Sequence, residues 1–163
     1  MCLKSYLTVV HGSNSYSTRN QLWNDLGHIN RTYISEAWAV LGDFNIARFT
    51  DEKLGGKTLP FAKLASSNDC ITKCQLMDLK HVGSKWSWHN STIGLGRIIG
   101  RLDRVLCSHL WIDSLAKSFY EYHCFATSDH APMSLHFTAT SNSGPKPILQ
   151  LLGKLWRIER GSH

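Results

Sequence analysis

The order of short apolar segments along the chain constrains its fold more than any other feature. The first ten residues have the pattern of a strand and end at turn-like residues 11–14. Residues 18–29 then carry apolar side chains at helical spacing, with Thr18 and Gln21 at the spacing of a capping box. Residues 38–41 predict a buried strand that stops at a Gly-Asp pair. The chain therefore begins with a strand, an amphipathic helix and a second strand.

The rest of the chain predicts further short elements of one domain. We predict a helix over 61–74, a shorter helix over 108–115 and a surface loop over 51–60. Strands are predicted over 76–82, 86–90, 98–107, 119–125 and 133–138, with 91–96 as the turn of a hairpin. A length of 163 residues suits one domain, which we place at 1–140, followed by a linker and weakly structured tail over 141–163.

Positive charge collects in one part of the sequence. The chain has 18 Lys and Arg against 12 Asp and Glu, and this net charge of +6 suits a polyanionic partner without proving one. Residues 80–104 contain five Lys and Arg residues and a single acidic residue, Asp103, together with Trp86 and Trp88. Such a mixture can follow a phosphate backbone and stack a base. A solvated strand face with two core tryptophans fits the same residues.

Several classes of protein do not fit the sequence. Its apolar runs are only a few residues long, which is too short for a membrane span or a signal peptide. The five cysteines include no Cys-x-x-Cys pair, which argues against a disulfide framework and against a zinc ribbon. We therefore expect an intracellular protein with no membrane partner.

Four short features carry the side chains with chemical potential. They are Gly42-Asp43-Phe44-Asn45, Trp86-Ser87-Trp88, Arg101-Leu102-Asp103-Arg104 and Ser128-Asp129-His130. Each alone has a structural explanation: an Asp that caps a turn, core tryptophans, an ion pair of Asp103 with a neighbouring Arg, and a hydrogen-bonded loop. Their combination is more informative than any one of them.

Taken together and in this order, the four features resemble the endonuclease/exonuclease/phosphatase superfamily, which includes deoxyribonuclease I. The chain looks in particular like the endonuclease domain of plant LINE-type (non-LTR) retrotransposons. The resemblance runs from about Val9 to Phe137 and includes Glu52-Lys53-Leu54-Gly55-Gly56, Asp78-Leu79 and Trp111. It implies an α/β fold, a four-layer sandwich of two mixed β-sheets flanked by helices, with the site where strand-end loops meet.

This resemblance implies metal-dependent hydrolysis of phosphodiester bonds in DNA. Asp43 would orient or deprotonate the attacking water, and Asn45 would hydrogen-bond the phosphate or that water. His130 would donate to a phosphate oxygen, while Asp103 would accept from its other ring nitrogen. Asp129, together with Asp43, would hold the metal, which is Mg²⁺ or else Mn²⁺. These roles require Asp103 and His130 to lie within hydrogen-bond distance, with the other groups facing the same cleft.

The resemblance also implies DNA as the partner and a nuclear location, and it implies no protein partner. The residues that we expect to bind nucleic acid combine the bases and tryptophans of 80–104: Lys85, Trp86, Trp88, Arg97 and Arg101.

The chain departs from the family's pattern near its start. His11 stands where the family has a tyrosine, and no glutamate matches the family's principal metal ligand. We therefore expect an N-terminally truncated domain that lacks its first strands, exposes a sheet edge or apolar face, and has weakened or lost activity. Two alternatives to the endonuclease stay open: a non-catalytic nucleic-acid-binding remnant and a small-molecule phosphatase of the same superfamily.

Overall fold

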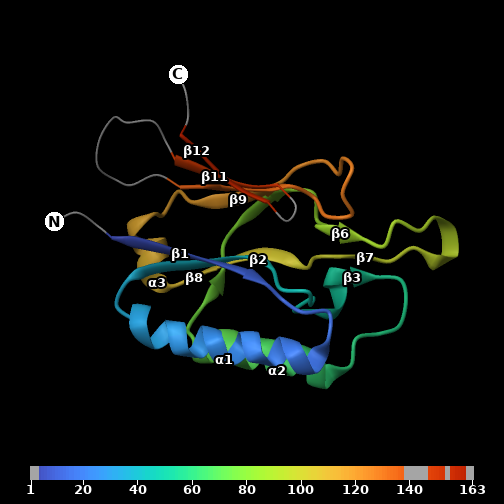
Figure 1. The fold of residues 1–163 in the computed structure, drawn as a ribbon, viewed down its shortest axis with the longest axis horizontal. Helices are drawn as coiled ribbons and strands as arrows, with labels where there is room; N and C mark the ends of the chain where they lie inside the picture. The colour runs from blue at the N-terminus through green and yellow to red at the C-terminus, as the bar shows by residue number, and fades with distance from the viewer. Residues whose placement is uncertain (1–3, 138–146, 153–154, 161–163) are drawn as a thin grey trace.

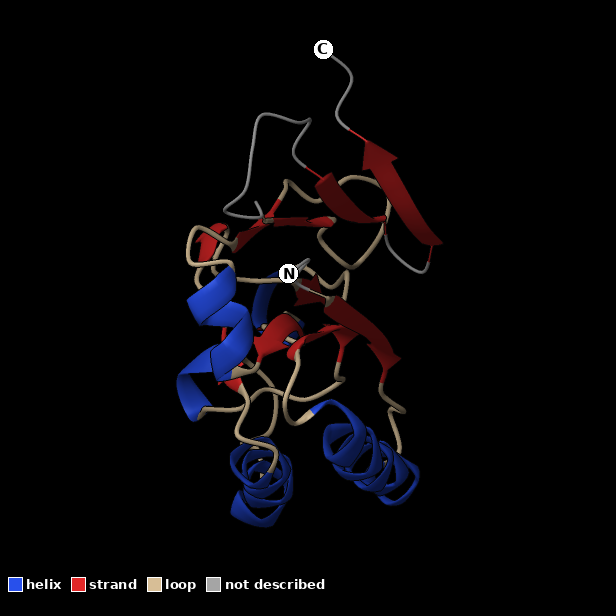
Figure 2. Ribbon diagram, turned by 90° about the vertical axis from the view of Figure 1, so that its left-hand side faces the viewer, coloured by secondary structure: helices blue, strands red, loops and turns tan. Residues whose placement is uncertain are grey.

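The elements of the protein are arranged in layers (Figure 1). The computed structural model describes residues 4–137, 147–152 and 155–160, and the side chains of residues 4–137. Figure 2 shows two helices on one side, a first sheet in the middle and a second sheet on the opposite side. A small three-stranded sheet lies at one end of this sandwich (Figure 1).

The first sheet is mixed and has the strand order β1-β2-β8-β4. Its strands are β1 (Ser5–His11), β2 (Ala37–Asp43), β8 (Asp103–Cys107) and β4 (Met77–Asp78). β1 runs parallel to β2, while β8 is antiparallel to both β2 and β4. Every residue of β2 is buried, because this strand has a packed layer on both faces. The strand predicted around Trp38 is confirmed, and the strand predicted over the first ten residues is confirmed as β1 in its described part, with residues 1–3 outside the described residues.

Helices α1 (Tyr16–Tyr33) and α2 (Phe61–Lys73) cover the outer face of this sheet. Trp23 and Leu26 of α1 and Ile71 of α2 are buried in one cluster with Trp38 and Val40. The structure confirms both helices, but the predicted capping box is wrong. The helix has already begun at Tyr16 with Ser15 as its N-cap residue, so Thr18 lies inside the first turn and is not at the capping position.

The second sheet is also mixed and has the strand order β12-β11-β10-β9-β5. The strands are β5 (His81–Gly83), β9 (Phe119–Tyr122), β10 (Met133–His136), β11 (Pro147–Leu152) and β12 (Leu155–Arg160). Buried side chains of both sheets meet in the core between them, including Leu41 and Val105 from one side and Tyr120 and Leu135 from the other. Trp111 of helix α3 (His109–Ser114) belongs to the same cluster.

Two predicted strands are each divided between different sheets. Residues 98–107 form β7 (Ile99–Gly100) in the small sheet and β8 in the first sheet. The division falls at Arg101 and Leu102, whose N–H groups bond to Glu52 O and to Ser87 Oγ and not to a neighbouring strand. Residues 76–82 likewise divide into β4 and β5, which therefore connect the two large sheets.

The small sheet contains the predicted hairpin. It has the order β3-β7-β6, where β3 is Lys53–Leu54 and β6 is Trp88–His89. β6 and β7 pair antiparallel around a turn that contains the short helix η2 (Gly94–Gly96), so the hairpin is confirmed. The predicted surface loop over 51–60 needs a correction. Its first part forms η1 (Thr50–Glu52) and β3, and Glu52 is buried.

The prediction of a weakly structured tail over 141–163 is wrong for the described part of that segment, which forms two strands. Strands β11 and β12 pair with each other, and β11 extends the second sheet from β10. The Ser, Asn, Gly and Pro residues of 141–146, which suggested a linker, lie outside the described residues. The boundary that we placed at residue 140 stays a prediction.

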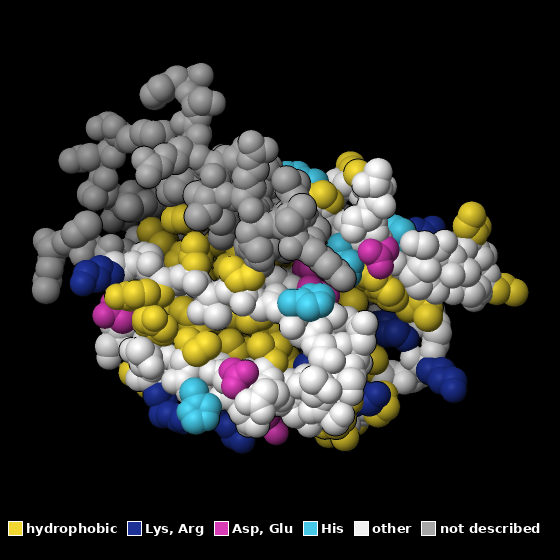
Figure 3. Space-filling view, viewed as in Figure 1, with side chains coloured by type: hydrophobic (Ala, Val, Ile, Leu, Met, Phe, Trp, Pro, Cys, Tyr) yellow, Lys and Arg dark blue, Asp and Glu magenta, His cyan; other side chains and the backbone are white. Residues whose placement is uncertain are grey.

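Strand β1 lies at the edge of the first sheet in the described part of the chain. Its Leu7 and Val9 side chains are 38% and 44% exposed. Figure 3 shows hydrophobic side chains gathered over this part of the molecule. The exposed edge and apolar face that we expected are therefore found at β1. Among the described residues, no helix combines the length and apolar character needed to cross a membrane.

Candidate active site

Three strands bring polar side chains to the same end of the first sheet. The pairing register sets His11 of β1 beside Asp43 of β2, and Asp43 beside Asp103 of β8. Gly42 makes this approach possible: its φ is +136°, and a Cβ at this position would lie 2.1 Å from Val10 O. Only glycine fits there, so the Gly-Asp sequence at the end of β2 is a requirement of the sheet as well as a turn.

Asp103 and His130 form the hydrogen bond that their predicted roles require. Asp103 Oδ2 lies 2.9 Å from His130 Nδ1, although the two residues are 27 positions apart in the sequence. Asp103 is only 3% exposed. Because its acceptor is fixed by the sheet, the imidazole is held in the tautomer with a proton on Nδ1. The geometric prediction for this pair is confirmed.

Ser87 connects the strand of Asp103 to the loop of His130. Its hydroxyl accepts hydrogen bonds from the N–H groups of Leu102 and Asp103, at 2.9 and 3.0 Å. Its carbonyl accepts from Ala131 N at 2.8 Å, directly after the histidine. Ser87 is fully buried. This role of Ser87 was not predicted from the sequence, where the only signal for it is a small polar residue between two tryptophans.

Asn45 and Asp43 are bonded to each other. Asn45 donates its backbone N–H to Asp43 Oδ1 at 2.7 Å and its side-chain amide to Asp43 Oδ2 at 2.9 Å. The same amide donates to Gly12 O at 2.7 Å. Asn45 has a positive φ of 53°, a conformation that asparagine tolerates better than most residues. Asn45 therefore orients the Asp43 carboxylate and connects it to the end of β1.

The charges at this site oppose one another. Burial, and next the charge of Asp103, raise the pKa of Asp43, although the hydrogen bond from Asn45 N works in the other direction. Burial alone would lower the pKa of His130, but the hydrogen bond and charge of Asp103, with the charges of Asp43 and Asp129, outweigh it and raise the pKa. A carboxyl and an imidazole with raised pKa values side by side are typical of acid–base sites.

His11 also faces the site. Its Nδ1 lies 3.6 Å from Asp43 Oδ2, and its side chain is 62% exposed. His130 Nε2 lies 3.8 Å from the same Asp43 oxygen, so two imidazoles approach this carboxylate. The residue that departs from the family's pattern is thus a neighbour of the predicted catalytic aspartate.

Asp129 directly precedes His130 in the sequence, but it is not part of the cluster formed by Asp43, Asp103 and His130. It is exposed, and its Oδ2 accepts a hydrogen bond from Trp88 Nε1 at 3.0 Å. Trp88 and His130 also form an isolated β-bridge, which holds the tryptophan beside the histidine loop. The metal-ligand role of Asp129 stays a prediction.

The donor atoms of the site fit a divalent cation. Asp43, Asp103 and His130 each offer one ligand atom, all within 4.8 Å of one another. Among the described residues, no Lys or Arg forms an ion pair with Asp43 or Asp103. Two buried carboxylates with histidines as their only ion-pair partners favour the approach of a cation, and Mg²⁺ prefers carboxylate oxygens.

Of the side chains predicted to bind nucleic acid, some lie on the surface of the protein and one lies in its interior. Arg97 is exposed, and Lys85 is exposed with its Nζ 4.9 Å from the centre of the Trp86 ring. Trp86 and Trp88 are half-buried, so each offers part of its ring to a ligand. These four positions are accessible at least in part, and their role in binding nucleic acid stays a prediction.

Arg101 requires a correction. Its side chain is 12% exposed, and its guanidinium is bonded to Glu52 Oε1 at 3.1 Å and to the Tyr120 hydroxyl. The pattern of bases could not show this, because the partners of Arg101 are distant in the sequence. We therefore assign Arg101 to the interior of the molecule and remove it from the nucleic-acid surface.

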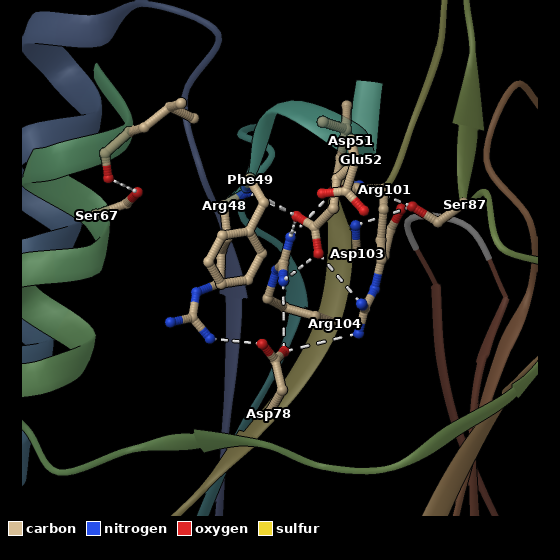
Figure 4. A network of polar contacts seen from close by, with 12 residues as sticks. Arg48, Phe49, Asp51, Glu52, Ser67, Asp78, Ser87, Arg101, Asp103 and Arg104 are labelled. Atoms are coloured by element: carbon tan, nitrogen blue, oxygen red, sulfur yellow. Dashed lines mark hydrogen bonds and ion pairs between the residues drawn. The ribbon is translucent and has the colours of Figure 1, made fainter. Parts of the chain in front are cut away.

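Glu52 is the centre of an internal ion network that the sequence analysis missed (Figure 4). Its Oε2 accepts from Arg104 Nη2 at 2.8 Å and from Arg48 N at 2.7 Å. Arg104 Nη1 also donates to Asp78 at 3.3 Å. Burial would raise the pKa of Glu52, but the hydrogen bond and charge of Arg104 outweigh it and lower the pKa. This network holds Arg101 and Arg104, which flank Asp103 in the sequence, and it therefore helps to position Asp103.

The comparisons with known proteins bear on the fold. No protein-family profile matches the sequence, and a search of curated proteins finds no match. Among solved structures, the chain is similar to a crystal structure of beta toxin 275-280 from Staphylococcus aureus, with a TM-score of 0.50 and 12% sequence identity. The match covers 79% of this chain and 50% of that chain, so the described protein spans half the length of its neighbour. At this identity the likeness concerns the fold, and it confirms the predicted α/β sandwich of deoxyribonuclease I type.

Proposed function

We propose that the protein hydrolyses phosphodiester bonds of DNA in a metal-dependent reaction, as a relative of LINE-type retrotransposon endonucleases. The observation that carries this proposal is the 2.9 Å bond between Asp103 and His130 beside the buried Asp43. The sequence resemblance assigns the same three residues to one site, independently of their distances. A nuclear location is part of the same proposal.

His130 acts on the phosphate. Asp103 fixes Nδ1 and favours the protonated ring, so the opposite nitrogen is free to donate to a non-bridging phosphate oxygen. The positive charge of the ring compensates the negative charge that develops on the phosphate as water attacks.

Asp43 acts on the water. Its raised pKa makes it a better proton acceptor than an ordinary surface carboxylate. Asn45 keeps the carboxylate oriented by donating to both of its oxygens. A water placed between Asp43 and the phosphate would lose its proton to Asp43 as the new P–O bond forms and the P–O bond to the leaving oxygen breaks, and the leaving oxygen would then take a proton from solvent.

Asp43 and Asp129 are the residues that would hold the metal, Mg²⁺ or Mn²⁺. A divalent cation bound there supplies positive charge to the phosphate and to the leaving oxygen. Asp43 belongs to the group of side chains whose ligand atoms lie within 4.8 Å of one another, while Asp129 lies on the surface beside His130.

Two small substrates test the type of reaction. We expect the protein with Mg²⁺ to release nitrophenol from bis(4-nitrophenyl) phosphate, a diester, and not from 4-nitrophenyl phosphate, a monoester. Chelator and the His130→Ala substitution should each remove this activity, while Asp113→Asn on the exposed side of α3 should not. Preference for the monoester would contradict the proposal and favour the small-molecule phosphatase. Failure to cleave either compound, with DNA still bound, would favour the non-catalytic alternative.

A further inference from the structure

A cationic pocket adjoins the candidate active site. Its volume is about 210 Å³, and its lining includes Arg19, Lys53, Lys63, Asn45 and Trp88. We call it the Arg19 pocket. Asn45 belongs to both places, because its side-chain amide is bonded to Asp43 while the residue also lines the pocket. A ligand that extends from the active site past Asn45 therefore enters the Arg19 pocket.

The lining of this pocket is basic. Its lining includes three basic residues and no Asp or Glu. None of the three forms an ion pair with a carboxylate in the described part of the chain. Lys53 Nζ donates to the carbonyls of Gly55 and Lys57, and Lys63 Nζ lies 5.7 Å from the centre of the Tyr16 ring, so neither ammonium group is neutralised by a carboxylate.

Arg19 is the most informative of the three. It is 5% exposed, and only its Nη1 has a hydrogen bond recorded in the described residues, to Ser13 O at 2.7 Å. Its Nε is buried with no hydrogen-bond partner. Burial of a guanidinium without full satisfaction costs free energy, unless an anion completes its bonds. Burial also lowers the pKa of Arg19, although the charge of Asp43 in the neighbouring site works in the other direction.

The chemistry of the pocket matches a phosphate of a nucleic acid strand. Guanidinium and ammonium groups are the common ligands of phosphate oxygens. Every nucleotide of a strand carries a phosphate, so a strand whose scissile bond lies at Asp43 presents another phosphate nearby. Trp88, half-buried at the wall of the pocket and held by its bond to Asp129, offers a flat surface to the sugar or base between the two phosphates.

We propose that the Arg19 pocket binds a phosphate adjacent to the scissile one, so that the preferred substrate is a strand with at least two consecutive phosphates. This inference rests on the proposed function, and it adds a substrate class to it. A diester with a single phosphate would leave the pocket empty and bind more weakly.

The test measures binding without metal, so that cleavage plays no part. Three thymidine dinucleotides are titrated into the full chain at low salt with chelator: one has only the internal phosphate, and the others carry an additional 5′ or 3′ phosphate. We expect one of the two-phosphate ligands to bind about tenfold more tightly than the one-phosphate ligand, the size of one charge-assisted hydrogen bond. The double variant Lys53→Gln/Lys63→Gln should lose this advantage. The matched control Lys73→Gln/Lys117→Gln, which changes two exposed lysines away from the pocket, should keep it.

The results separate the inference from the proposed function. The proposed phosphate binding by the Arg19 pocket would be contradicted by equal affinity for the three dinucleotides. It would also be contradicted if the double variant still bound a two-phosphate ligand more tightly than the one-phosphate ligand, even in a protein that cleaves diesters. Inorganic pyrophosphate that binds as tightly as the best dinucleotide would also overturn it, because the site would then recognise a free anion and not a strand. A phosphate advantage in a protein that cleaves no diester would retain the pocket and contradict the enzyme.

Discussion

Asp103 determines the state of His130 at the scale of single residues. The imidazole is partly buried, which by itself disfavours its charge, and the Asp103 carboxylate reverses this effect. His130 therefore contributes stability that is fully present below the ordinary histidine pKa of 6.5 and is lost as pH rises through its higher folded pKa. Over the same pH range, the ring loses the positive charge on which its proposed contact with the phosphate depends.

Replacement of Asp103 by Asn tests this coupling. With the carboxylate removed, burial is opposed only by the weaker charges of Asp43 and Asp129, so the pKa of His130 should fall. The pKa can be followed from the pH dependence of the His130 ring signals in NMR spectra. We expect diester hydrolysis to drop by about 10²- to 10⁴-fold, the usual cost of losing such an orienting carboxylate or an acid–base group. Asp113→Asn is the control, and an unchanged His130 titration in Asp103→Asn would refute the coupling.

For Asp43, the ionised form that the proposed reaction needs is also the form that destabilises the folded protein. Its pKa is raised in the folded protein, so its ionised form is penalised and stability is lost as pH rises through the folded pKa. Asp43→Asn removes the charge and keeps an oxygen for Asn45 N. We therefore expect a higher free energy of unfolding than the wild type at pH 7, a smaller difference at pH 4, and no hydrolysis. Urea unfolding at both pH values measures this, and a variant less stable than wild type at pH 7 would show that Asp43 is structural.

At the scale of secondary-structure elements, the site depends on close contact between β1 and β2. Gly42→Ala would press a Cβ against Val10 O at 2.1 Å in a backbone conformation that L-residues rarely adopt. We expect a loss of at least about 2 kcal/mol in the free energy of unfolding. Gly27→Ala on α1 is the matched control, because nothing lies within 4 Å of its Cβ and alanine favours a helix. Equal stability of the two variants in denaturant titrations would contradict the described approach of the strands.

The ion network around Glu52 supports the junction between β7 and β8. Glu52→Gln leaves the buried Arg104 without its main anionic partner, and we expect a loss of about 3–5 kcal/mol. Lys85→Gln breaks the exposed ion pair with Asp51 at 3.8 Å and should cost at most about 1 kcal/mol. Thermal and urea unfolding compare the two. A Glu52→Gln protein as stable as Lys85→Gln would mean that the network adds no net stability.

The elements show which features a sequence can predict. Helical spacing over 61–74 and the apolar run at Trp38 were sufficient for α2 and β2, because these signals are local. The break between β7 and β8 carries no local signal, since it depends on hydrogen bonds from Glu52 and Ser87. Glu52 was predicted to lie in a surface loop for the same reason: its glycine- and lysine-rich neighbours indicate exposure, and its arginine partners are about 50 positions away. Asp103 and His130 were paired through the family resemblance, and spacing alone would not have paired them.

At the scale of the whole molecule, the proposal brings together a sandwich, a site at its strand ends and a cationic pocket beside that site. Glu52, Ser87 and Gly42 hold the strands, and the strands hold Asp43, Asp103 and His130. Arg19, Lys53 and Lys63 extend the site in one direction. The surface bases Lys85 and Arg97 add positive charge on the hairpin side. This distribution suits a long polyanion better than a small monoester.

Nicking of supercoiled plasmid DNA by the full chain tests the central claim most directly. With Mg²⁺ at low salt, we predict slow conversion to the open circular form, no conversion in chelator, and none by Asp43→Ala or His130→Ala. The control Asp113→Asn should nick at the wild-type rate. Nicking that persists in chelator or in His130→Ala would contradict the assigned chemistry. A wild-type protein that binds the plasmid without nicking it would contradict the enzyme and leave the nucleic-acid-binding alternative.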